Sequence, residues 1–331
     1  MLLLAGGGPK VLAAEFHPAA AWSTTQLSST TDKAPGIAIT GATAVGVIRN
    51  TTFGNEVAYT TWAPGSFQAF TSIANAVTTQ AAPSIVASGA RADVVFLGDN
   101  KKHYYAAHVA AWSPTAEAVG GVAAQSSGPT AAGVTAIGSD TIVAFAGGNG
   151  DLYDQTRTGG MWLAASPHNL GNTVALTPAI ITPTAGPALM IVYVRSTDAK
   201  ILFTTRTGNV WTAPTVIDAN SFTVDPVAAA ALPGGEVILA FRGLNQGIYF
   251  SRYNPAGAPL WSPPQPLATP NVTTPSCPAV AAGVGGADAE IGFVNTVDSK
   301  AYHARLTGMI WSAPVLVGGT SLTTISIASA P

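Results

Sequence analysis

Short apolar segments alternate with turn residues along almost the whole chain. Residues 225–268 read DPVAAAAL, GGEVILAF, IYFSRY and LWSPPQPLA, with turns rich in Gly, Asn and Pro between them. The same order recurs in residues 177–217 and 277–317. Segments of this length between turn residues predict strands, and four in succession predict an antiparallel meander. We therefore expect an all-β chain built from a repeated four-stranded unit.

The second strand of each unit is apolar on both faces, as in VVFLG, IVAFA and VILAF. A strand without polar alternation is expected to lie between two covering layers. In five units an aromatic residue lies near the end of this strand. Burial of each ring is expected to stabilise the fold by roughly 2 to 3 kcal/mol. These predicted core residues are Phe96, Phe145, Tyr193, Phe241 and Phe293.

The tryptophans repeat with the unit. All seven follow one another at spacings of 40, 50, 50, 49, 50 and 50 residues, at positions 22, 62, 112, 162, 211, 261 and 311. Four-stranded units at a period of about 50 residues are typical of propeller blades. The sequence therefore predicts one domain over residues 1–331, a seven-bladed β-propeller with four antiparallel strands per blade.

The two ends of the chain together supply one blade. The N-terminal segments match strands 2, 3 and 4 of the repeat, in MLLLA, VLAAEF and WSTTQLS. The sequence pattern of strand 1 is found instead at the C-terminus, in TTISIASA at residues 323–330. We expect the C-terminal strand to join the N-terminal blade and so to hide the sheet edges of an open array. The start of the chain is a poor signal peptide, and an export signal is expected to have been removed. The predicted blades are 1–29 plus 321–331, then roughly 30–72, 73–121, 122–171, 172–218, 219–270 and 271–320.

Composition removes several classes of function. Hydrophobic residues make up 47% and charged residues 9%, a balance that excludes disorder. The net charge of −2 gives no basic field for nucleic acid, and no apolar run is long enough for a membrane helix. The single Cys277 excludes an internal disulfide and a cysteine zinc site, and is expected to be a small buried hydrophobe. The oligomeric state stays open.

No familiar catalytic motif is present. Gly-x-Ser-x-Gly, a phosphate loop, His-Glu-x-x-His and a calcium loop are all missing, so no catalytic residue, metal or cofactor is predicted. Alternation along a strand separates His103 from His108, which argues against a shared metal ion. The acidic residues flanking the turns between strands 1 and 2 are expected to be solvated. They are Asp93, Asp140, Glu236 and Asp288.

A basic side chain recurs near the end of strand 3. In three units an arginine follows an aromatic residue by three positions: Phe203…Arg206, Tyr249…Arg252 and Tyr302…Arg305. Tyr105…His108 is a looser match with histidine as the basic residue, and in Tyr153…Arg157 the spacing is four. The tryptophan then opens strand 4, so five blades are expected to bring a cation near an indole. In a structural interpretation, the cation stacks on the indole or binds a carbonyl of the hairpin. In a functional interpretation, the two form a sugar site, in which the aromatic ring packs against the C–H face of the sugar and the arginine donates hydrogen bonds to its hydroxyls.

A second repeated set lies in the turns between strands 2 and 3, which must open on the opposite face of the ring. Asn and Asp suit tight turns, so turn chemistry is the default interpretation. The residues are Asn100, Asn149, Asp198, Asn245 and Asp298.

The segments RTGNVWTAP (206–214) and RLTGMIWSAP (305–314) resemble the repeats of bacterial and fungal β-propeller lectins. The resemblance implies a non-enzymatic, multivalent, secreted or cell-surface protein that binds fucose, galactose or related sugars between blades. A protein-binding scaffold and a glycan-active enzyme, sialidase-like or a polysaccharide lyase, remain alternatives. The ligand-binding residues so implied are His108, Trp112, Arg157, Trp162, Arg206, Trp211, Arg252, Trp261, Arg305 and Trp311.

The same hairpins are similar to degenerate sialidase Asp-boxes. Gly159, Gly208 and Gly308 each stand three residues before a tryptophan, as in that box. The box aspartate is replaced by Arg157, Arg206 and Leu306. This departure weakens the sialidase alternative.

Overall fold

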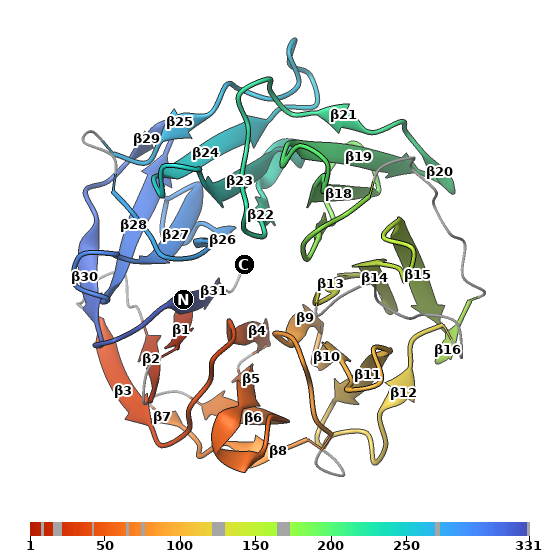
Figure 1. Ribbon diagram of the computed structural model, residues 1–331, viewed down its shortest axis with the longest axis vertical. Coiled ribbons are helices and arrows are strands. Elements are labelled where there is room, and N and C mark those ends of the chain that lie inside the picture. Colours follow the sequence, from red (N-terminus) through yellow and green to blue (C-terminus); the bar gives the residue numbers. More distant parts are fainter. Residues whose placement is uncertain are drawn as a thin grey trace.

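The fold is a ring of seven four-stranded antiparallel blades, as the sequence predicted (Figure 1). A computed structural model describes residues 1–7, 10–15, 22–41, 43–63, 66–73, 77–120, 130–163, 173–268 and 272–329. Helix is confined, within these ranges, to the 3₁₀ turns Thr51–Phe53 and Pro233–Gly235. None of the described helices is long and apolar enough to cross a membrane.

The strands are numbered along the chain, and the blades are numbered from the N-terminus. Blade 1 contains β31 (Thr324–Ala328), β1 (Leu2–Gly6), β2 (Val11–Glu15) and β3 (Ser23–Leu27); blade 2 contains β4 (Gly36–Thr40), β5 (Thr43–Asn50), β6 (Glu56–Ala63), β7 (Ser66–Phe67) and β8 (Thr71–Ser72). Blade 3 contains β9 (Ser84–Ser88), β10 (Arg91–Leu97), β11 (His103–His108) and β12 (Glu117–Ala118); blade 4 contains β13 (Gly133–Ile137), β14 (Asp140–Ala146), β15 (Leu152–Thr158) and β16 (Met161–Trp162). Blade 5 contains β17 (Ala179–Ile181), β18 (Leu189–Val194), β19 (Ile201–Thr207), β20 (Val210–Trp211) and β21 (Thr215–Val216). Blade 6 contains β22 (Ala228–Ala231), β23 (Val237–Arg242), β24 (Ile248–Tyr253) and β25 (Gln265–Pro266); blade 7 contains β26 (Ala279–Ala282), β27 (Ala289–Val294), β28 (Ala301–Thr307), β29 (Ile310–Trp311) and β30 (Val315–Gly318).

The first strand of each blade lies nearest the axis, and the fourth lies at the rim (Figure 1). Apolar residues of the inner strands, such as Ile85, Ala230 and Ala281, line an axial cavity of about 650 Å³. The outer strands are short and broken, because prolines such as Pro214 and Pro263 cannot donate a ladder hydrogen bond. An edge strand tolerates such breaks, and they discourage pairing with other chains.

The hydrophobic core lies between blades rather than within one. Every residue of β10 from Ala92 on, and all of β18 and β27, is buried, which confirms that the second strands are covered on both faces. The five predicted core aromatics are all buried, with at most 3% of any residue exposed. One continuous cluster joins Val192 of blade 5 to Leu239 of blade 6. Each blade is therefore stabilised mainly by its two neighbours.

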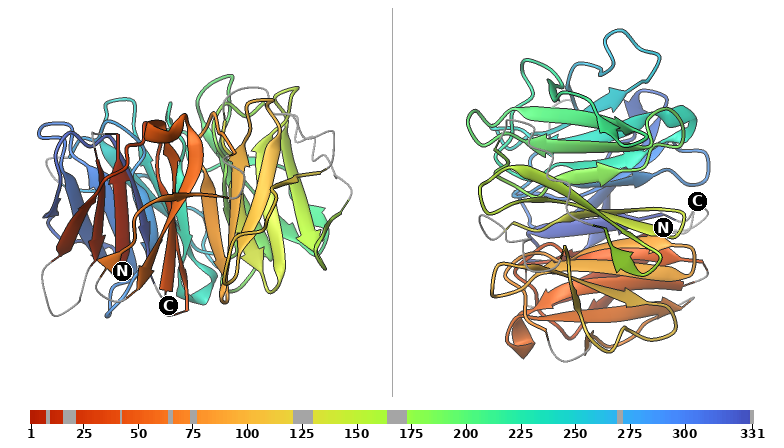
Figure 2. Two further views of the ribbon diagram at one scale, coloured as in Figure 1. Left: turned by 90° about the horizontal axis from the view of Figure 1, so that it is seen from below. Right: turned by 90° about the vertical axis from the view of Figure 1, so that its right-hand side faces the viewer.

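The C-terminal strand closes the ring. β31 pairs antiparallel with β1 (Figure 1). Leu3 stands opposite Ile327 in this pairing. Ile325 and Leu322 join the cluster of Leu3 and Leu12. The N-terminal segment is thus made of two strands, as predicted, and the two ends of the described chain lie close together (Figure 2). The predicted blade limits near residues 121, 171 and 270 lie outside the described residues.

One tryptophan is not equivalent to the others. Trp62 lies on the third strand of blade 2, paired with Phe67, whereas Trp162 and Trp211 open fourth strands. Phe67 therefore occupies the position that tryptophan takes elsewhere. Because Phe67 lies five residues after Trp62, this difference accounts for half of the ten residues by which the Trp22–Trp62 spacing falls short of 50.

Deletion of residues 321–331 is expected to destroy cooperative unfolding, because it removes the strand that pairs with β1 and two buried isoleucines. Size-exclusion chromatography and urea unfolding followed by tryptophan fluorescence measure the result. The double variant Ile325→Ala, Ile327→Ala keeps the strand and is expected to stay monodisperse with a lower midpoint. A truncated protein with unchanged solubility and midpoint would show that closure is dispensable.

Acid is expected to destabilise the fold through His103. This side chain is fully buried beside Phe145, and desolvation lowers its pKa from 6.5 to about 4. Between these values the unfolded chain binds more protons than the folded one, so the free energy of unfolding falls as the pH decreases from about 6.5 to 4. The contribution is at most about 3 kcal/mol. Urea titrations at pH 7 and pH 4 should show a smaller loss for His103→Gln than for the native chain, and equal losses would contradict the assignment.

Candidate functional site

Tryptophan side chains insert between consecutive blades. Five of the seven reach from the rim of one blade to the third strand of the preceding blade and meet an aromatic ring there edge to face. The contacts, with ring centroids 5.1 to 5.7 Å apart, are Trp22–His303, Trp112–Tyr59, Trp162–Tyr105, Trp261–Phe203 and Trp311–Phe250. Such edge-to-face pairs add to the free energy of burial. These tryptophans therefore hold neighbouring blades together.

The basic side chains of strand 3 occupy two different registers. Arg157 and Arg206 stand directly opposite Trp162 and Trp211. In blade 7, Leu306 takes that place opposite Trp311, and Arg305 lies one residue earlier. A shift of one residue along a strand turns a side chain to the other face of the sheet. The arginines therefore face the preceding blade in blades 4 and 5, and the following blade in blades 6 and 7.

Arg252 and Arg305 are engaged within the protein. Arg252 donates from Nε to Glu236 (3.0 Å) and from Nη1 to the Gly308 carbonyl of blade 7 (2.8 Å), and its Nη2 also pairs with Glu236. Arg305 donates from Nε to Glu290 (3.1 Å) and from Nη2 to the Val284 carbonyl. The expectation that each hairpin holds its own cation beside its own indole is therefore wrong for blades 6 and 7. These two arginines bind turns and carboxylates.

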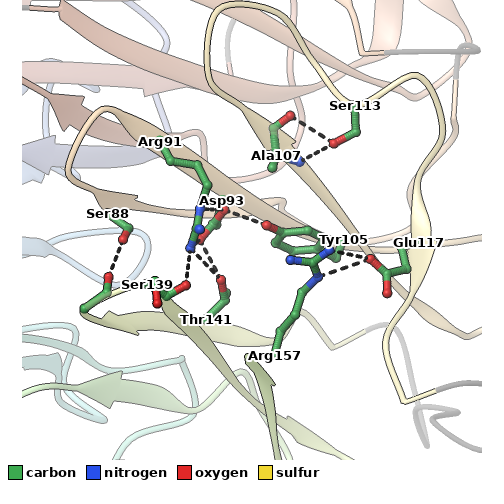
Figure 3. A network of polar contacts seen from close by, with 11 residues as sticks. Ser88, Arg91, Asp93, Tyr105, Ala107, Ser113, Glu117, Ser139, Thr141 and Arg157 are labelled. Atoms are coloured by element: carbon green, nitrogen blue, oxygen red, sulfur yellow. Dashed lines mark hydrogen bonds and ion pairs between the residues drawn. The ribbon is translucent and has the colours of Figure 1, made fainter. Parts of the chain in front are cut away.

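Blades 3 and 4 enclose a different arrangement (Figure 3). The Arg157 guanidinium lies over the Tyr105 ring, with its central carbon 4.6 Å from the centroid. Its Nε and Nη2 donate to a single oxygen of Glu117, at 3.1 and 3.0 Å. Trp162 meets the same tyrosine ring at 5.6 Å. Within the described residues, Arg157 Nη1 and Glu117 Oε1 have no protein partner, and the Glu117 side chain is 41% exposed.

A buried aspartate fixes the far side of this ring (Figure 3). Asp93 accepts hydrogen bonds from Arg91 (2.8 Å twice), from the Tyr105 hydroxyl (2.7 Å) and from Thr141 of blade 4 (2.6 Å). Desolvation, and then the bond to Asp93, raise the pKa of Tyr105 to about 12. Asp93 is fully buried, so the expectation of a solvated turn carboxylate is wrong for it. Its role is to hold Tyr105 rigidly beneath Arg157.

Blades 4 and 5 carry a variant of the same arrangement. Asp154 occupies the strand-3 position where other blades present an aromatic ring to the incoming tryptophan. Arg206 donates from Nη1 to Asp154 at 3.4 Å and lies over the Trp211 ring at 5.7 Å. Its Nε is buried without a hydrogen-bond partner among the described residues. Within the described part of the chain, the hydrogen bond from Nη1 to Asp154 is thus the one polar contact of this guanidinium, and its Nη2 is left for a ligand.

His108 lies between blades 2 and 3, among Tyr59 and Trp112, at ring distances of 6.0 and 5.2 Å. Burial lowers the pKa of its imidazole, so at neutral pH it is uncharged. His103 faces the opposite side, toward Phe145, as alternation predicted. The described ranges contain no cluster of three or more potential metal ligands.

The structure thus divides the predicted site residues. It brings Arg157 with Trp162, Arg206 with Trp211 and His108 with Trp112 into shared interfaces, and it separates Arg252 from Trp261 and Arg305 from Trp311. The residues that sequence reasoning missed are Glu117, Tyr105 as a platform, and Asp154. The only signal in the sequence was the change from Arg-Thr-Gly at residues 157–159 and 206–208 to Arg-Leu-Thr-Gly at 305–308.

No family model and no curated protein sequence matches the chain. Among solved structures, a triple arginine-to-alanine variant of AofleA from Arthrobotrys oligospora superposes with a TM-score of 0.63 at 10% identity, covering 90% of both chains. The fucose-specific lectin of Aleuria aurantia gives 0.58 at 15% identity, covering 86% of this chain and 96% of the lectin. A leech intramolecular trans-sialidase gives 0.52 at 10% identity, covering 80% of this chain and 64% of its own. At these identities the likeness shows a shared β-propeller fold.

Trp261→Ala is expected to lower the free energy of unfolding by about 3 to 5 kcal/mol, because it empties a tightly packed interface. Trp261 is 3% exposed and contacts Phe203 of the preceding blade. Val210→Ala, at a hairpin position that is 73% exposed, is the control and should change stability by less than about 0.5 kcal/mol. Equal urea midpoints for the two variants would show that the indole does not hold the blades together.

Proposed function

We propose that the chain is a carbohydrate-binding lectin with several similar, weak sugar sites between its blades, and that it acts without catalysis. The observation that carries the proposal is the arrangement of Arg157, Glu117 and Tyr105 at the interface of blades 3 and 4. The lectin of Aleuria aurantia, which shares the fold, is described as fucose-specific. A terminal fucose is therefore the first ligand to test, and galactose the second.

The chemistry of the arrangement suits a sugar hydroxyl. A hydroxyl both donates and accepts; among the described residues Arg157 Nη1 and Glu117 Oε1 have no protein partner, so the first can donate to it and the second can accept from it. The ion pair fixes the two groups in place, so little side-chain entropy is lost on binding. Trp162, which is half-buried beside Tyr105, supplies the apolar surface that packs against sugar C–H groups, whereas Tyr105 is buried beneath Arg157 and holds the guanidinium in place.

The interface of blades 4 and 5 is the second proposed site. Arg206 lies over Trp211 and bonds to the Asp154 carboxylate through Nη1, and its Nη2 has no hydrogen-bond partner among the described residues. Two or more weak sites on one rigid ring raise avidity for a glycan-coated surface by a factor of ~10²–10⁴. A secreted or cell-surface location, which we also propose, would place the ring where such surfaces are found.

Absence of catalysis is proposed on the distribution of the arginines. A sialidase brings three arginines to one substrate carboxylate, whereas Arg157, Arg206, Arg252 and Arg305 each lie at a different blade interface. Arg252 and Arg305 are moreover bound to carbonyls and carboxylates of the protein. A protein-binding scaffold gains no specific support from the described side chains.

The test is a dense glycan array probed with the native chain and with Arg157→Ala and Arg206→Ala. Each substitution is expected to weaken binding of fucose- or galactose-terminated glycans by about tenfold or more, because a charge-assisted hydrogen bond is lost. Their combination should abolish it.

Arg252→Ala is the matched control. It removes the same type of side chain from the same strand of a neighbouring blade, but one whose Nε, Nη1 and Nη2 all bind the protein. It should lower stability and leave glycan affinity unchanged. No binding by the native chain to any glycan, or equal effects of all three substitutions, would count against the proposal.

A further inference from the structure

A nine-residue pattern that the hairpin sites do not involve occurs three times. FLGDNKKHY (96–104), FAGGNGDLY (145–153) and FRGLNQGIY (241–249) all read Phe-x-Gly-x-Asn-x-x-x-Tyr. Each copy begins at the end of a second strand, crosses the following turn and ends on the third strand. These turns open on the face of the ring opposite to the tryptophan hairpins.

The pattern builds a fixed aromatic platform. In blade 6 the Tyr249 ring stacks on Phe241 with centroids 5.9 Å apart and planes 22° apart. Gly243 is required beneath it, because a Cβ there would lie 2.7 Å from the tyrosine ring. Asn245 donates from Nδ2 to the Tyr249 hydroxyl at 2.9 Å, and its Oδ1 accepts from Gly247 N at 3.0 Å. Blade 3 repeats the stack with Phe96 and Tyr104 at 5.8 Å and 18°.

The platforms of blades 6 and 3 each line a cavity. The cavity of blade 6 measures about 460 Å³, and its lining includes Phe241, Tyr249, Asn245, Asp218, Asn220 and Phe222. The cavity of blade 3 measures about 520 Å³ and is lined by Phe96, Tyr104, Asn100, Asp99 and Thr78, among others. Both are closed on one side by the connection from the preceding blade, at Asn220 and Phe222 in one and at Thr78 in the other. The corresponding connection before blade 4, at residues 121–129, lies outside the described residues.

We infer that these two cavities are a second class of carbohydrate site, each holding one pyranose ring against the tyrosine platform. The volumes fall in the range of small-molecule sites, roughly 300 to 1,000 Å³. Tyr249 and Tyr104 are half-buried, so part of each ring faces the open cavity. A planar ring flanked by amide and carboxylate side chains matches a pyranose, which has an apolar C–H face and a rim of hydroxyls.

The rims of the two cavities differ and set different preferences. Blade 6 presents exposed Leu244 where blade 3 presents Asp99, two residues after the second-strand end in both. Asp99 is held by Thr78 of the preceding connection, which donates to its Oδ2 at 2.5 Å. The blade 3 cavity therefore favours a sugar with a hydroxyl donor at this point, and the blade 6 cavity favours an apolar substituent such as a methyl group.

The experiment isolates these cavities from the hairpin sites. In the variant Arg157→Ala, Arg206→Ala, native mass spectrometry counts bound methyl α-L-fucoside, methyl β-D-galactoside and methyl β-D-glucoside at graded concentrations. At least one of these glycosides is expected to bind in two copies. Adding Tyr104→Ala and Tyr249→Ala should weaken that binding by about tenfold or more, because the stacking surface is lost.

Tyr302→Ala is the matched control. Tyr302 stacks on Phe293 at 5.8 Å and donates to Asp298 at 2.9 Å, but it lines neither cavity. It should have a comparable effect on stability and none on the number of bound glycosides. Asn220→Trp, at an exposed position of the blade 6 rim, obstructs that cavity without disturbing a platform and should remove one bound copy.

The outcomes separate the two proposals. If the double arginine variant binds none of the glycosides while the native chain does, the cavities are not sugar sites, and the lectin function through the hairpins stands. If glycoside binding persists but is insensitive to Tyr104→Ala, Tyr249→Ala and Asn220→Trp, the second class of site is likewise overturned. If only the cavity variants reduce the binding of the native chain, the hairpin sites fail and the inference drawn here holds.

Discussion

The contact between an indole and the third strand of the preceding blade determines the rest of this structure. A blade is a small four-stranded sheet whose second strand is apolar on both faces, so it has no core of its own. The tryptophan fills the outer, wider part of the wedge between two blades and fixes their separation. Five of these contacts share one edge-to-face geometry, with ring centroids from 5.1 to 5.7 Å apart. The ring closes because each interface repeats the same packing.

This constraint also determines where polar chemistry is possible. Toward the axis the interfaces are apolar, whereas at the rim of several interfaces the indole is accompanied by an arginine from a third strand. Where that charge is fully paired, as with Arg252 and Glu236, it strengthens the joint between blades. Where one donor and one acceptor have no partner among the described residues, as with Arg157 and Glu117, the joint has the groups that the proposed sugar site needs. The proposed binding site is thus an ion pair between two blades that leaves one donor and one acceptor without a partner among the described residues.

Much of the fold could be predicted from the sequence, because the features that specify it are local and repeated. The alternation of apolar runs and turns marked the strands, and the tryptophan period counted the blades. The likeness of residues 323–330 to other first strands placed the closing strand on β1. The count was correct even though Trp62 lies on a different strand from the rest, since Phe67 fills the equivalent position. A periodic signal survives one irregular copy because the other copies fix its period.

The sequence by itself thus determined the architecture, the number of blades, the buried second strands and the closure. Only the tertiary structure decided which basic residues share an interface with which rings. One additional residue between arginine and glycine reverses the face on which the arginine lies, because side chains alternate along a strand. The partners of each arginine also come from another blade: Glu117 and Arg157 are 40 residues apart, and Asp154 and Arg206 are 52 apart. Such pairs form only when one repeat packs on the next, and the sequence pattern of a single repeat does not contain this information.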